Sequence, residues 1–176
     1  EIIKNLKKMK LINVDTINKY KNYKIFILNF ENQKKLIKSI LYPFNVNIIT
    51  EFDQKQKILS KSNLAVAASG SISLELCKYR TPSIIVYDTN ILTRVLLKIL
   101  VKLDYCTLIN IFFNKEVIPE FLFGNFNFKN VTEKIYELLN NKNKRTQQIK
   151  YMKEFQKNMV GKEKPSEIIV NEMFKG

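Results

Sequence analysis

Short runs of apolar and β-branched residues alternate along this chain with longer segments in which apolar residues recur every three or four positions. The short runs predict buried strands, and the longer segments predict amphipathic helices. The expected strands cover residues 24–29, 46–50, 63–68 and 83–87. The helices expected after them cover residues 31–41, 53–62, 71–79 and 91–102.

Strands that alternate with helices in this way indicate an α/β fold, with a Rossmann-like open parallel sheet and helices on both of its faces. Beyond about residue 115 the pattern predicts helices alone, and these close the sheet. They are expected at residues 115–123, 128–141, 143–159 and 164–175. A chain of 176 residues with 45% hydrophobic content and few glycines or prolines is expected to form one domain, 1–176, with 128–176 as its C-terminal helical segment.

The formal net charge of +14 suggests an anionic partner, either nucleic acid or an acidic membrane surface. The charge is spread unevenly: residues 1–60 carry +7, residues 61–125 carry +2 and residues 126–176 carry +5. Only three of the 30 basic residues are arginine, whereas surfaces that read guanine or grip phosphate favour arginine. We therefore expect no nucleic-acid partner.

The chain contains no histidine, which excludes a Ser-His-Asp or Cys-His relay and removes the usual zinc ligands. We expect no metal site. Cys77 and Cys106 lie in apolar segments and are expected to be reduced core residues of a cytoplasmic protein. No apolar run reaches the length of about 18 residues that a membrane span needs.

The sequence Ser69-Gly70-Ser71 lies between the expected strand 63–68 and the helix that follows. Ligands of open α/β sheets bind outside the carboxyl ends of the strands, and a glycine there permits close approach. Ser71 can cap the helix, whose free N–H groups suit a diphosphate, and Glu75 lies one turn further, where it can accept hydrogen bonds from a ribose diol. The alternative is an ordinary turn and cap, with Glu75 as a partner of the helix dipole.

Three segments together resemble the C-terminal half of the lipid-A-disaccharide synthases, a GT-B glycosyltransferase family. They are AASGSISLE (67–75), RTPSIIVY (80–87) and LVKLDYCTLINIFFNKEVIPEFL (100–122). The resemblance covers most of the chain, and it implies that the fold is the C-terminal domain of a GT-B enzyme. On this reading the whole chain is one nucleotide-sugar-binding domain.

The resemblance implies that Ser69, Gly70, Ser71 and Glu75 face the UDP part of the donor, with Ser71 where the family usually has threonine. It also implies that Asn110, Glu116 and Glu120 lie near the active-site cleft. The chain departs from the family pattern at several positions. Ile109 replaces a proline, Asn114-Lys115 replaces glycine-arginine, Asp88 replaces an arginine and Phe123 replaces a glutamine.

By the same resemblance the enzyme transfers 2,3-diacylglucosamine from its UDP conjugate to 2,3-diacylglucosamine 1-phosphate, with inversion and release of UDP. No cofactor is implied. The family's proposed carboxylate base belongs to an N-terminal domain, and Glu1-Ile2 resembles a position just after that domain's arginine loop. We therefore expect the chain to be part of a two-domain enzyme and inactive alone.

Alternatives remain at this point. Another GT-B enzyme that uses a UDP-sugar would share the loop and glutamate. A non-catalytic basic interaction module would bind nucleic acid in a salt-sensitive way and would not bind UDP. The helix expected at 91–102 could contact acyl chains or the cytoplasmic face of the inner membrane, or it could be an ordinary helix packed on the sheet. A group of phenylalanines between residues 112 and 128 could line an acyl site, but we favour a role in seating the C-terminal helices and the expected N-terminal domain.

Overall fold

The computed structural model of the chain describes residues 24, 26–28, 34–42, 47–68, 71–87, 105–122 and 127–159. The strands within these ranges are β1 (Phe26–Leu28), β2 (Asn47–Ile49), β3 (Ala65–Ala67), β4 (Ser83–Tyr87) and β5 (Glu120–Leu122). The helices are α2 (Lys34–Leu41), α3 (Phe52–Lys61), α4 (Ser71–Tyr79), α6 (Leu108–Phe113), α7 (Phe128–Asn140) and α8 (Lys142–Met159). The alternation of strands and helices expected up to β4 is confirmed.

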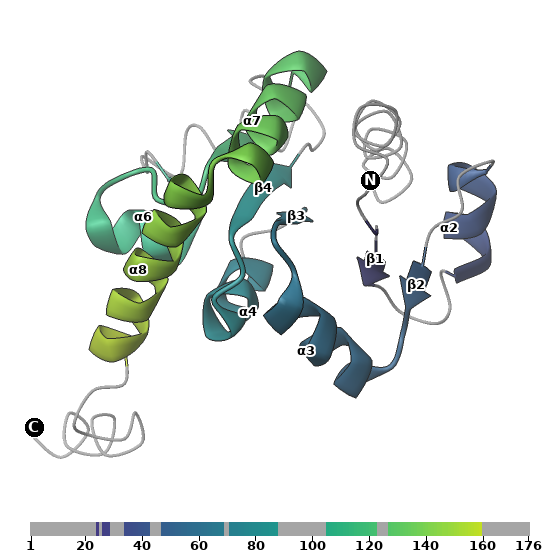
Figure 1. Ribbon diagram of the computed structural model, residues 1–176, viewed down its shortest axis with the longest axis horizontal. Helices are drawn as coiled ribbons and strands as arrows, with labels where there is room; N and C mark the ends of the chain where they lie inside the picture. Colours follow the sequence, from purple (N-terminus) through teal and green to yellow (C-terminus); the bar gives the residue numbers. More distant parts are fainter. Residues whose placement is uncertain are drawn as a thin grey trace, which may run out of the picture.

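The strands form two parallel groups, β1-β2 and β3-β4-β5. In the second group Ala65 lies opposite Ser83, and Ile85 lies opposite Glu120. All recorded pairings are parallel, so the carboxyl ends of β3, β4 and β5 lie at one edge. Figure 1 shows the helices α4, α6, α7 and α8 gathered around this group, with β1, β2 and α2 to one side.

Alternate side chains of β4 enter two different cores, which places helices on both faces of the sheet. Ile85 packs in a cluster with side chains of α3, α4, α6 and α8, including Leu76 and Met152. Ile84 and Val86 pack on the other face against Val131, Ile135 and Leu138 of α7. This is the predicted Rossmann-like α/β arrangement, with α7 and α8 as the closing helices.

The prediction of a helix at 115–123 is wrong. The chain there leaves α6 at Asn114, which has a left-handed backbone with φ 46°, and then enters β5, which pairs with β4. The Pro119 carbonyl accepts a hydrogen bond from Ile85 N at 2.9 Å, so the segment is already extended before β5 begins. Pairing with the central strand outweighs the local helical pattern.

Cys77 is buried as expected, but Cys106 is exposed, so its assignment to the core is wrong. In this turn Thr107 takes the buried position and Cys106 points outward. The aromatic side chains described here do seat α8: Phe112 and Phe113 of α6 form edge contacts with Phe155 and Tyr151. The helices expected at 91–102 and 164–175 lie outside the described residues.

Candidate functional site

The strand–turn–helix unit at residues 65–79 is the framework of the candidate site. β3 ends at Ala67 and α4 begins at Ser71, which confirms the predicted order. Ser69 and Gly70 lie outside the described residues, and only the backbone of Ser71 is described. Because β3 is parallel to β4, the start of α4 lies at the carboxyl edge of the sheet, where α/β proteins bind nucleotides.

Glu75 lies one turn after the start of α4, about 6 Å along the helix axis from Ser71. Its side chain is half-buried, whereas Leu76 beside it is buried in the core. No hydrogen bond or ion pair to the Glu75 carboxylate is recorded from any described residue.

Asn110 lies on α6 with its side chain fully buried. Its Oδ1 accepts hydrogen bonds from the backbone N–H groups of Val117 and Ile118, both at 2.8 Å. Its Nδ2 donates to the Ile118 carbonyl at 2.7 Å and to the Glu120 carboxylate at 2.8 Å. Every hydrogen-bonding position of the amide is thus used within the protein, and the amide fixes the loop from α6 to β5.

Glu120 joins this network from the first position of β5. Its carboxylate accepts hydrogen bonds from Cys106 N at 2.7 Å and Thr107 N at 2.8 Å, the backbone groups just before α6. Cys106 is exposed as a residue, but partial burial of its thiol, and secondarily the Glu120 charge, raises the pKa of that thiol. The structure therefore brings two of the predicted cleft residues, Asn110 and Glu120, into direct contact, and both hold backbone.

Glu116 lies in the same loop, but its side chain is exposed and it does not join the Asn110–Glu120 network. The neighbouring departures from the family pattern have local explanations. Asn114 occupies a left-handed position that glycine or asparagine adopts most easily, and Ile109 is buried in the core. Lys115 donates to the Tyr151 hydroxyl at 3.0 Å, and Asp88 lies outside the described residues.

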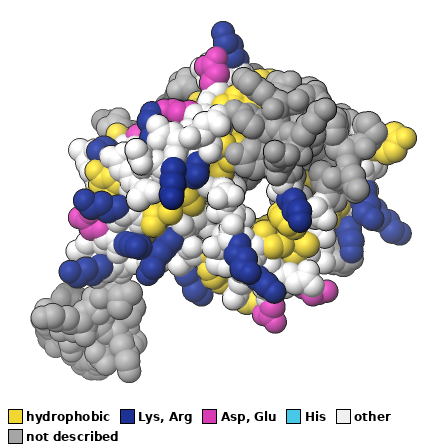
Figure 2. All heavy atoms as spheres, viewed as in Figure 1, with side chains coloured by type: hydrophobic (Ala, Val, Ile, Leu, Met, Phe, Trp, Pro, Cys, Tyr) yellow, Lys and Arg dark blue, Asp and Glu magenta, His cyan; other side chains and the backbone are white. Residues whose placement is uncertain are grey.

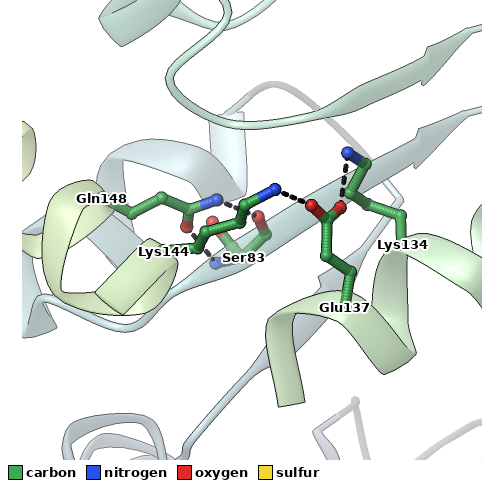
Figure 3. A network of polar contacts seen from close by, with 5 residues as sticks. All are labelled: Ser83, Lys134, Glu137, Lys144 and Gln148. Carbon is green, nitrogen blue, oxygen red and sulfur yellow. Dashed lines mark hydrogen bonds and ion pairs between the residues drawn. The ribbon is translucent and has the colours of Figure 1, made fainter. Parts of the chain in front are cut away.

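Gln148 is a structurally important residue that the sequence analysis missed. Its amide exchanges hydrogen bonds with the backbone of Ser83, accepting from Ser83 N at 2.9 Å and donating to Ser83 O at 3.3 Å. Figure 3 shows this pair beside the Glu137 carboxylate, which lies between Lys134 and Lys144. The sequence did hold an indication that Gln148 is buried, because it lies four residues before Met152 and therefore on the buried face of α8.

Two further observations concern metal binding and membrane spanning in the described part of the chain. Its cysteine, aspartate and glutamate side chains form no group of three that could hold a metal ion. None of its helices is long and apolar enough to cross a membrane.

A sequence profile of the lipid-A-disaccharide synthetase family matches residues 1–173 of the chain. The lipid-A-disaccharide synthase of Rickettsia prowazekii is 34% identical over 131 residues, which are 74% of this chain and 34% of that protein. The lipid-A-disaccharide synthase of Rickettsia bellii is 37% identical over 117 residues, which are 66% of this chain and 30% of the relative. The matched part thus spans about a third of the length of these relatives.

Proposed function

This chain belongs to the lipid-A-disaccharide synthetase family, and on that premise we propose that it is the nucleotide-binding half of a GT-B glycosyltransferase of lipid A biosynthesis. The proposed reaction transfers 2,3-diacylglucosamine from its UDP conjugate to 2,3-diacylglucosamine 1-phosphate. Attack by the acceptor hydroxyl inverts the anomeric carbon, forms a β-1,6 bond and releases UDP.

The proposed donor site is Ser69, Gly70, Ser71 and Glu75. The loop and the first N–H groups of α4 hold the diphosphate, and the Glu75 carboxylate accepts hydrogen bonds from the ribose hydroxyls. The observation that carries this assignment is the position of Glu75. It lies one turn into α4, the helix that follows the carboxyl end of β3, and its half-buried side chain has no recorded partner among the described residues. Charge that develops on the departing UDP would be stabilised at the same helix start.

We propose that the catalytic base comes from residues outside this sequence. Inverting transfer needs a carboxylate that deprotonates the acceptor hydroxyl. Glu120 is already engaged by backbone N–H groups, and Glu75 is assigned to the ribose. Asn110 and Glu120 would shape the cleft by holding the loop after α6, and Glu116 would border the cleft from that loop.

Because both proposed sugar substrates carry acyl chains, we propose that the enzyme works at the cytoplasmic face of the inner membrane, in peripheral contact with it. The absence of a spanning helix among the described residues is compatible with such contact. The charge of +14 would favour an anionic lipid surface.

Isothermal titration calorimetry of the chain with UDP tests the donor site. Glu75→Ala should weaken UDP binding by about 1.5–3 kcal/mol, the range for hydrogen bonds to a charged group. Gly70→Val should weaken it further, because a branched side chain would fill the space that the diphosphate needs. Glu133→Ala, at an exposed position of α7, is the matched control and should bind UDP like the unchanged chain. Unchanged UDP affinity in a folded Glu75→Ala variant would refute the assignment.

A further inference from the structure

A groove of about 690 Å³ lies between the C-terminal ends of α4 and α8, away from the proposed donor site at the start of α4. Leu74, Cys77, Phe155 and Met159 supply its apolar surface. Leu74 and Met159 remain 43% and 55% exposed, so part of this apolar surface meets solvent. The groove is therefore accessible and lined with apolar side chains.

Four cationic side chains surround this apolar surface: Lys78, Arg80, Lys153 and Lys157. None of the residues that line the groove is acidic, and no described carboxylate is recorded in an ion pair with any of the four. Figure 2 shows lysine and arginine side chains gathered over the region of α8, where acidic side chains are few. The groove thus combines positive charge with exposed apolar area.

Arg80 is held at the edge of this groove by a specific arrangement. Its backbone has φ 56°, a left-handed conformation that costs a non-glycine residue energy. Gln156 of α8 donates to the carbonyls of Cys77 and Lys78 at 2.8 and 3.0 Å, and its Oε1 accepts a hydrogen bond from Arg80 Nε at 3.2 Å. The left-handed conformation is the cap that ends α4, because Arg80 N and Thr81 N donate to the carbonyls of Cys77 and Leu76. The hydrogen bond from Gln156 holds the Arg80 guanidinium at the edge of the groove.

We propose that this groove, defined by Leu74, Lys78, Arg80, Lys153, Lys157 and Met159, docks the protein on an anionic phospholipid surface. The proposal deepens the membrane contact proposed above and rests on that part of the proposed function. The lysines contact phosphate headgroups as flexible point charges, and Leu74 and Met159 enter the boundary between headgroups and acyl chains. An acidic protein would match the charge, but three exposed lysines around open apolar side chains suit a lipid surface, which offers both phosphate groups and acyl chains, better than an array of carboxylates.

Vesicle flotation with the 176-residue chain tests the proposal, using phosphatidylcholine vesicles with and without phosphatidylglycerol. The groove variant Lys78→Gln, Lys153→Gln, Lys157→Gln removes three charges. Each basic residue near an anionic surface raises the partition coefficient onto vesicles roughly fivefold, so the loss of three should lower it on the order of 100-fold. The control variant Lys35→Gln, Lys57→Gln, Lys61→Gln removes the same charge from exposed positions of α2 and α3, and its partitioning should change by less than about threefold.

A second variant, Leu74→Gln with Met159→Gln, leaves the charge intact and should reduce partitioning at high salt, where apolar insertion dominates. Three results would overturn the proposal: equal losses in the groove and control variants, no binding to anionic vesicles, or lysine-dependent binding to polyglutamate but not to vesicles.

UDP affinity, measured on the same proteins, should be unchanged in the groove variants. Loss of vesicle binding alongside intact UDP binding would support the groove independently of the donor site. Intact vesicle binding without any UDP binding would instead count against the proposed function.

Discussion

Asn110 shows how one side chain can determine the shape of a loop. Its amide is buried and connects α6 to Val117, Ile118 and Glu120. Asn110→Ala would leave the buried Ile118 N–H without an acceptor, at a cost of about 1–3 kcal/mol, whereas Val117 N–H would keep its hydrogen bond to the Lys115 carbonyl. We therefore expect the free energy of unfolding, measured by urea denaturation, to fall by about 2 kcal/mol or more.

Asn143→Ala is the matched control for this prediction, because Asn143 is exposed on the first turn of α8. It should change the free energy of unfolding by less than about 0.5 kcal/mol. If Asn110→Ala proved as stable as Asn143→Ala but lost affinity for UDP, Asn110 would bind the ligand directly. Its proposed role in holding the loop between α6 and β5 would then be wrong.

The two thiols give a prediction about pH. Burial raises the pKa of Cys77 to about 11, and burial together with Glu120 raises that of Cys106. A thiol that keeps its proton more tightly in the folded state stabilises the fold at neutral pH. The Cys77 contribution is lost as the pH rises from the ordinary value of 9.0 through about 11. Cys77→Ala should therefore show a shallower fall in unfolding free energy across this range than the unchanged chain.

The effect of Glu120 on Cys106 can be tested by alkylation. Glu120→Gln removes the carboxylate charge, so the pKa of Cys106 should fall and its reaction with iodoacetamide at pH 8 should become faster. Cys77 is the internal control, because its buried thiol should stay unreactive in both proteins. An unchanged Cys106 rate would mean that burial alone raises its pKa.

At the scale of elements, α8 is fixed to the sheet by the paired hydrogen bonds between Gln148 and Ser83. Gln148→Leu keeps the size of the side chain but leaves a buried donor and acceptor of β4 unpaired. We expect a loss of about 2–4 kcal/mol in the free energy of unfolding, measured by chemical denaturation. Gln147→Leu, on the exposed side of the same turn, should be nearly neutral. Equal effects of the two substitutions would show that the Ser83 contacts add nothing.

At the scale of the whole molecule, we expect this chain to bind UDP-diacylglucosamine without turning it over. The proposed donor site lies within its sequence, whereas the catalytic base is proposed to come from residues outside it. Transfer requires the reacting hydroxyl to be both positioned and deprotonated, and donor binding supplies neither. The purified chain, mixed with donor and acceptor, should release no more UDP than a protein-free control. Robust formation of disaccharide would show that the catalytic groups lie in this chain.

The sequence alone was sufficient to predict most of the strands and helices of the fold. Strands such as 83–87 and helices such as 71–79 follow from hydrophobic period, because burial against one sheet imposes that period on each element. The motif order also indicated the family, and the later profile match confirms it. The sequence showed Asn114 only as a departure from the family's glycine, and it did not predict the left-handed cap that the structure has there.

Tertiary structure decided the features that depend on partners distant in the chain. Residues 120–122 form a strand because β4 offers backbone groups to pair with, and no local period carries that information. Asn110 and Glu120 hold backbone because the turn after α6 folds back over them. The cationic groove exists only because α8 packs beside the end of α4, which brings together side chains about 75 positions apart in sequence.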